Sequence, residues 1–79
     1  MRIRLFAVAR ELAGAETLEL NVAEPYTLAQ LRTALAAAVP ALAPILPHVL
    51  FAVGSDYIRD NTLLTEDTEV ACIPPVSGG

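Results

Sequence analysis

The sequence predicts an α+β fold in which a mixed sheet of four or five strands packs against one main helix. Three observations predict it. In residues 2–8 and 17–22, every second side chain is apolar, which is the pattern of a strand with one face buried. Residues 28–39 repeat apolar side chains at helical spacing, and residues 68–73 alternate once more. Because the helical segment separates pairs of strands, we expect a sheet that is covered on one face.

The composition indicates one small, folded, acidic domain. The chain has 79 residues, which is enough for one hydrophobic core. Of these residues 54% are hydrophobic and 18% are charged, a composition that excludes a disordered chain. A net charge of -4, with arginines but no lysine, argues against binding to nucleic acid or to an anionic membrane. Cys72 is the sole cysteine, and residues 1–10 hold no apolar run of signal-peptide length. We therefore expect a reducing compartment, the cytoplasm, and no metal cluster.

The first two strands are expected to pair as a hairpin. Residues 9–15, with Gly14 as a helix breaker, provide a long and partly helical connection between them. The inward-facing side chains are predicted to be Ile3, Leu5, Ala7, Leu18, Leu20 and Val22. The opposite face of the first strand carries Arg2, Arg4, Phe6 and Val8.

The main helix has a clear beginning and end in the sequence. Thr27 and Gln30 form a capping-box pattern, in which each side chain satisfies a backbone N–H of the first turn, and Tyr26 is placed to pack on Leu31. Pro40 requires the helix to end by about residue 39. The apolar stripe that faces the sheet begins with Leu28, Leu31 and Leu35.

The second half of the chain is predicted to contain three further strands. Residues 40–48, punctuated by proline, form a crossing with a short 3₁₀ turn, and residues 48–54 form an apolar strand. A Gly-Ser-Asp turn leads to a brief strand around residues 57–58, and residues 59–67 are predicted to be a loop. Residues 33–55 carry no formal charge, but three prolines within them exclude a membrane-spanning helix.

The β-grasp arrangement fits this order of elements best. In it the first and last strands lie parallel at the centre of the sheet, a pairing that needs the long crossover available here. Residues 1–73 then form the domain, and residues 74–79 form an extended tail. In the last strand, Val70 and Cys72 face the core, where Cys72 is a packing residue, and Ile73 faces outward.

Two apolar side chains are predicted on the face that the helix leaves open. Phe6 and Ile73 point to that face from neighbouring strands, which indicates a contact surface for a partner protein. His48 and the carboxylates of Glu66, Asp67 and Glu69 are expected to be solvated surface groups. We therefore predict no metal site and no bound cofactor.

The C-terminal sequence PPVSGG predicts a stiff exit followed by a slim tip. Two prolines end the sheet and extend the chain, so six residues reach roughly 20 Å, far enough to enter a pocket of a partner. The predicted contacts with that pocket are Pro74, Pro75, Val76, Ser77 and Gly78. The reactive group of the tip is the main-chain carboxylate of Gly79, which becomes an electrophile once AMP from ATP is attached. Attack by sulfur or by a cysteine then gives a thiocarboxylate or a thioester.

Three stretches resemble the family of molybdopterin synthase small subunits, which are sulfur carriers: RLFAVARELAG at 4–14, EVACI at 69–73, and the terminal PPVSGG. The resemblance implies that a ubiquitin-activating-like enzyme adenylates Gly79 with ATP and that a sulfur-donating enzyme converts Gly79 to a thiocarboxylate. It implies that the tail then enters the large synthase subunit and gives its sulfur to cyclic pyranopterin monophosphate. It also implies that this chain is the sulfur-donating subunit and holds no complete active site of its own.

By position, the resemblance assigns the hydrophobic partner contact to Phe6 and Ile73, the sulfur-bearing carboxyl to Gly79, and the narrow part of the tail to Gly78. The sequence departs from the family at 66–69, where an Asp-Gly-Asp-Glu turn is common, and at Cys72, where a larger apolar residue is common. Two alternatives stay open: a related ubiquitin-like carrier or modifier, in tRNA thiolation or the thiamine pathway, and a β-grasp adaptor with an inert tail.

Overall fold

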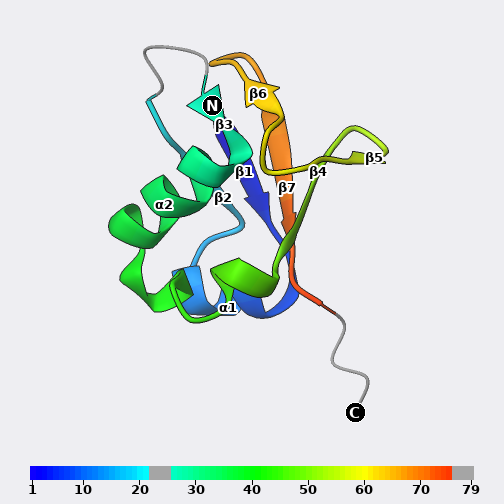
Figure 1. The fold of residues 1–79 in the computed structure, drawn as a ribbon. Helices are drawn as coiled ribbons and strands as arrows, with labels where there is room; N and C mark the ends of the chain where they lie inside the picture. The colour runs from blue at the N-terminus through cyan, green and yellow to red at the C-terminus, as the bar shows by residue number, and fades with distance from the viewer. Residues whose placement is uncertain (22–25, 76–79) are drawn as a thin grey trace.

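The computed structural model describes residues 1–21 and 26–75, which form a five-stranded mixed sheet with helices on one side (Figure 1). The strands lie in the order β2-β1-β7-β4-β5. In chain order they are β1 (Arg2–Leu5), β2 (Thr17–Glu19), β4 (Leu50–Val53), β5 (Asp56–Tyr57) and β7 (Glu69–Ile73). The helices are α1 (Ala7–Ala13) and α2 (Leu28–Ala38). The predicted β-grasp architecture is confirmed.

The centre of the sheet is formed by the first and last strands of the chain. Strand β1 pairs parallel with β7, with Ile3 opposite Val70, and antiparallel with β2, with Ile3 opposite Leu18. Strand β4 covers the other side of β7 in antiparallel register. Both edges of β7 are therefore paired, and β7 is the middle strand of the sheet (Figure 1).

The first strand is shorter than the sequence predicted. It ends at Leu5, and Ala7 and Val8 belong to α1 rather than to the strand. Phe6 keeps an extended backbone, and its N–H donates a last ladder bond to the carbonyl of Cys72 at 3.3 Å. Ala7 then takes a positive φ of 51°, which turns the chain into the helix. Short apolar runs fit both a strand and a helix, so alternation alone misplaced this boundary.

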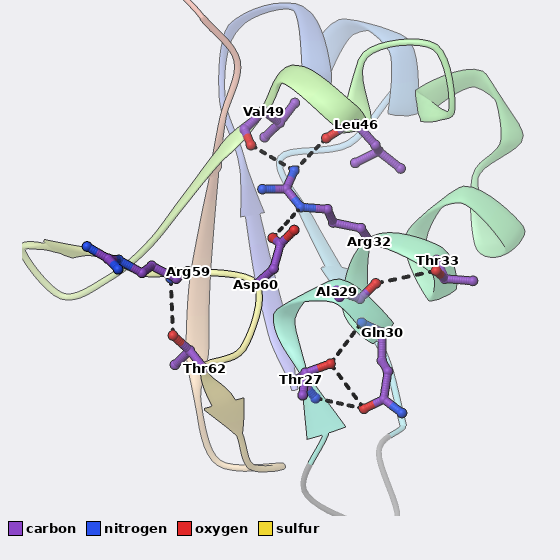
Figure 2. Close-up of polar contacts among 10 residues, drawn as sticks. All are labelled: Thr27, Ala29, Gln30, Arg32, Thr33, Leu46, Val49, Arg59, Asp60 and Thr62. Atoms are coloured by element: carbon purple, nitrogen blue, oxygen red, sulfur yellow. Dashed lines mark hydrogen bonds and ion pairs between the residues drawn. The ribbon is translucent and has the colours of Figure 1, made fainter.

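Helix α2 begins and ends as predicted. The Thr27 hydroxyl accepts a hydrogen bond from the Gln30 N–H at 3.2 Å, and the Gln30 side-chain oxygen accepts one from the Thr27 N–H at 2.8 Å (Figure 2). Val39 caps the C-terminus, directly before Pro40. Leu28, Leu31 and Leu35 are fully buried against the sheet, so the predicted stripe is confirmed.

The crossing from α2 to β4 contains two 3₁₀ turns, Pro40–Leu42 and Leu46–His48, where one was predicted. Strands β4 and β5 form a hairpin whose turn begins at Gly54, with a positive φ of 62°. The segment predicted to be a loop, residues 59–67, contains a strand, β6 (Leu63–Leu64), that pairs with β3 (Tyr26–Thr27). A strand of two residues is too short to show alternation, which is why the sequence did not reveal it.

Cys72 belongs to the core, as predicted. Its side chain is fully buried, and burial raises the pKa of the thiol to about 11. The thiol therefore stays protonated and unreactive at physiological pH. His48 is exposed, also as predicted. In the part of the chain that the structure describes, neither helix is long and apolar enough to span a membrane.

Arg32 joins three segments of the fold, a role that the sequence analysis missed. Its Nε donates to Asp60 Oδ1 at 3.0 Å, and its Nη1 donates to the carbonyl oxygens of Leu46 and, at 2.8 Å, of Val49 (Figure 2). The guanidinium also lies over the Phe51 ring, 4.8 Å from its centroid. Arg32 thereby connects α2 to the second 3₁₀ turn and to the loop before β6.

Candidate functional site

The face of the sheet that the helices leave open carries a row of three paired residues across its three central strands, an arginine and two alanines. Arg4 of β1 lies opposite Ala71 of β7, which lies opposite Ala52 of β4. Residues on β1 and β7 that alternate with these, such as Leu5 and Cys72, are buried in the core. The open face is therefore the one to which the sequence assigned Phe6 and Ile73.

A groove with a volume of about 400 Å³ runs over this face. Phe6 and Ile73 both line it, so the structure brings the two predicted contact residues into one site. Their binding to a partner stays a prediction. The rest of the lining is Arg4, Ala52, Gly54, Glu69 and Ala71.

Two further apolar side chains extend the groove. Leu50, which lies opposite Ile73, is 51% exposed, and Tyr57, which lies opposite Ala52, is 65% exposed. Paired residues of a sheet point to the same face, so both belong to this surface. Sequence reasoning missed the contribution of β4 and β5, because the pairing of β4 with β7 is a long-range contact that no local pattern announces. Ala52 and Ala71, which also line the groove, have small side chains and so leave space between the larger side chains around them.

The charged residues of this region are largely paired with one another. Arg2 donates from Nε to Glu19 at 3.0 Å and lies 3.9 Å from Glu69, and these contacts raise its pKa, the Glu19 hydrogen bond most. Arg10 lies 3.7 Å from Glu16. Arg4 instead lies over the Phe6 ring, with its guanidinium carbon 5.4 Å from the ring centroid. Arg4 thus forms part of the rim of the groove beside the aromatic side chain.

The tail leaves the domain at the end of β7, next to the groove. Ile73 is the last strand residue, and Pro74, which has no N–H to donate, follows it. Pro74 is buried and Pro75 is exposed, so the accessible part of the tail begins at Pro75. Val76, Ser77, Gly78 and Gly79, four of the predicted site residues, lie outside the described residues.

The groove is the candidate site that the described residues provide. Across residues 1–21 and 26–75, no group of three His, Cys, Asp or Glu side chains is arranged to hold a metal ion. The buried thiol of Cys72 is unavailable as a nucleophile, since its pKa is raised to about 11. The groove has apolar side chains, Phe6 and Ile73, and two charged ones, Arg4 and Glu69, and it lies next to the start of the tail.

Comparison with known proteins identifies the family of this chain. A profile of the ThiS family matches residues 3–79. The molybdopterin synthase sulfur carrier subunit of Arabidopsis thaliana is 33% identical over 79 residues, which is 100% of this chain and 82% of that protein. The corresponding subunit of Chlamydomonas reinhardtii is 33% identical over 81 residues, covering 100% and 98% of the two chains.

Solved structures give the same answer for the fold. The crystal structure of SAMP1 from Haloferax volcanii superposes with a TM-score of 0.84 at 28% identity, covering 99% of this chain and 97% of that one. The solution structure of small archaeal modifier protein 1 from Methanosarcina acetivorans has a TM-score of 0.81 at 26% identity, covering 99% and 94%. The chain therefore belongs to the ThiS family of ubiquitin-like β-grasp proteins, together with the sulfur carrier subunits of molybdopterin synthase.

Proposed function

We propose that this chain is the sulfur carrier subunit of a molybdopterin synthase and that it carries sulfur as a thiocarboxylate on Gly79. The family match and the curated relatives support a sulfur carrier role. The observation that carries the finer proposal is the continuation of the central strand β7 into PPVSGG, beside a groove lined by Phe6 and Ile73. A firmly anchored strand leads to the tail, and an apolar surface lies where that tail starts.

The chemistry assigned to Gly79 follows from the properties of a carboxylate. A carboxylate resists nucleophilic attack until one of its oxygens becomes part of a good leaving group. An adenylating partner would attach AMP from ATP to the Gly79 carboxyl and release pyrophosphate. The terminal sulfur of a donor enzyme's persulfide would then attack the acyl carbon as AMP leaves, which gives an acyl disulfide. A second thiol would attack the donor's sulfur in that disulfide, which releases the Gly79 thiocarboxylate and leaves the donor as a disulfide. This chain contributes the carboxyl group and its presentation, whereas its partners contribute the activating groups.

The loaded tail would deliver sulfur in a pocket of the large synthase subunit. Two glycines at the tip give the smallest cross-section a polypeptide can have, so a narrow channel accepts them. There the sulfur would pass to cyclic pyranopterin monophosphate, and two such transfers would complete the dithiolene that binds molybdenum. The groove would hold the domain against the large subunit while the tail reaches in.

The mass of the intact chain tests the proposal directly. Replacement of one carboxylate oxygen by sulfur adds about 16 Da, because sulfur is that much heavier than oxygen and the chemistry is acyl substitution. We expect this increment on chains isolated from their native cells, located by fragmentation to Gly79, and its loss in cells that lack the adenylating enzyme. Chains that carry only the free acid in cells actively making molybdopterin would contradict the proposal.

A second candidate function is protein modification, which the likeness to small archaeal modifier protein 1 of Methanosarcina acetivorans favours. The same tail chemistry would then end in an isopeptide bond to a lysine of another protein. A gel containing a thiol-reactive mercury compound separates the two: a retained free thiocarboxylate slows the free chain, whereas a modifier gives larger conjugates that resist thiols.

The groove gives a further prediction, the effect of replacing Phe6 by aspartate. Phe6 is 37% exposed at the rim, and a carboxylate there should weaken binding of the large subunit about 10- to 100-fold, as loss of an aromatic contact residue does. Leu63→Asp is the matched control, because Leu63 is 68% exposed on β6 in the small second sheet. Isothermal titration calorimetry measures both affinities. Equal affinity for the Phe6 variant and the wild type would exclude this surface as the interface.

A further inference from the structure

Two arginines on the same face of β1 have different surroundings. Arg2 is opposite Glu19 on β2 and Glu69 on β7, and it forms ion pairs with both. Arg4 is opposite Thr17 on β2 and Ala71 on β7, neither of which carries a charge. Arg2 therefore has a carboxylate on each neighbouring strand, whereas neither residue directly opposite Arg4 carries one.

The remaining contacts of Arg4 place its charge in the groove. Its guanidinium lies over the Phe6 ring, 5.4 Å from the centroid, and Arg4 lines the groove together with Phe6 and Ile73. Glu69 also lines the groove, but its carboxylate lies 3.9 Å from Arg2 and forms an ion pair with it. Within residues 1–21 and 26–75, no carboxylate oxygen lies within 4.0 Å of it. An arginine stacked on an aromatic ring keeps its edge N–H groups available, and this edge is suited to a bidentate contact with a carboxylate.

Docking makes an unpaired charge in this position costly. A partner that covers the groove removes water from Arg4, and a charge that loses its water without gaining a counter-ion weakens binding. A partner with a carboxylate at this point offsets that cost. The chain as a whole has a net charge of -4 and would repel acidic surfaces, so the attraction at Arg4 is local and depends on where the carboxylate lies.

We propose that Arg4 determines partner specificity: it pairs with a carboxylate that the large synthase subunit places beside its apolar contact with Phe6 and Ile73. This inference rests on the proposed function and adds to it the chemistry of the docking partner. The groove accepts an apolar segment that carries an Asp or Glu, and it discriminates against segments whose corresponding residue is neutral or basic.

The test compares Arg4→Gln with Arg59→Gln in the full chain. Arg59 is exposed, forms no ion pair among the described residues and lies outside the groove lining, so both variants lose the same charge. Binding to the purified large subunit from the same organism is measured by isothermal titration calorimetry at low and high NaCl. We expect Arg4→Gln to bind about tenfold more weakly at low salt and to lose most of the salt dependence, whereas Arg59→Gln binds as the wild type does.

Each other outcome overturns the inference in a recognisable way. If Phe6→Asp weakens binding and Arg4→Gln does not, the interface is correct and the role of Arg4 is wrong. If Arg4→Gln weakens binding equally at both salt concentrations, Arg4 acts by packing on Phe6 and not by pairing with a carboxylate. If the wild-type chain does not bind the large subunit, the proposed function fails, and this inference fails with it. Thermal unfolding of each variant confirms that the domain is folded.

Discussion

Removal of Gly79 should abolish sulfur transfer while leaving the domain folded. The sulfur is proposed to sit on the carboxyl carbon of this residue, and a chain that ends at Gly78 would present its acyl group about 3.3–3.6 Å short of the reaction site. Misplacement by as little as 1 Å can cost a reaction about 100-fold. No described core residue lies beyond Cys72, so stability should be unaffected.

Formation of molybdopterin in a reconstituted reaction measures this effect. The reaction contains the adenylating enzyme, ATP, the sulfur donor, the large subunit and cyclic pyranopterin monophosphate. Gly78→Val should also abolish product, because a β-branched side chain does not fit where a glycine passes, whereas Ser77→Ala should retain activity. Binding of the shortened chain to the large subunit through the groove should persist. Normal product formation by the chain without Gly79 would refute the thiocarboxylate mechanism.

Replacement of Arg32 by alanine should lower the free energy of unfolding by about 2–4 kcal/mol. The change removes two hydrogen bonds to backbone carbonyls, the pair with Asp60 and the contact with Phe51. The Arg32 side chain is only 22% exposed, so water cannot fully replace these contacts. A domain of this size has about 4–12 kcal/mol of stability in total, so the loss is a large fraction of it.

Urea unfolding measures this loss against a matched control. Arg10→Ala removes a pair with Glu16 in which both side chains are more than half exposed, and exposed pairs contribute about 0–1 kcal/mol. Arg32→Lys keeps the charge but cannot donate to three acceptors in the same geometry, so it should recover only part of the stability. An Arg32→Ala variant that unfolds at the same urea concentration as Arg10→Ala would show that these contacts contribute nothing.

Local patterns in the sequence predicted most of the fold. The capping box at Thr27, the stop at Pro40 and the alternation of β7 each depend on neighbouring residues, and each is confirmed. Phe6 was predicted to face outward because it was placed inside a strand of residues 2–8, but the strand ends at Leu5. Phe6 still faces the groove because its backbone stays extended before the turn at Ala7.

What escaped prediction depends on contacts between distant parts of the chain. The bonds from Arg32 reach 14 to 28 residues along the sequence, and the contributions of Leu50 and Tyr57 to the groove depend on the register of β4 with its neighbours. The burial of Pro74 depends in the same way on how the domain packs around the end of β7. The one hint was that Arg32 is the sole charged residue in an otherwise uncharged helix.

The position of β7 between the strands β1 and β4 also has a mechanical consequence. Withdrawal of a tail from a tight channel pulls on the end of this strand, roughly along its axis. Because β7 is bonded on both sides, to β1 over four residue pairs and to β4 over three, such a pull loads the ladders in shear and shares the force among many bonds. A tail attached to an edge strand would load one ladder only, so each hydrogen bond would carry a larger share of the same force. Under the proposed function, this double pairing would let the domain withstand repeated insertion and extraction of the tail.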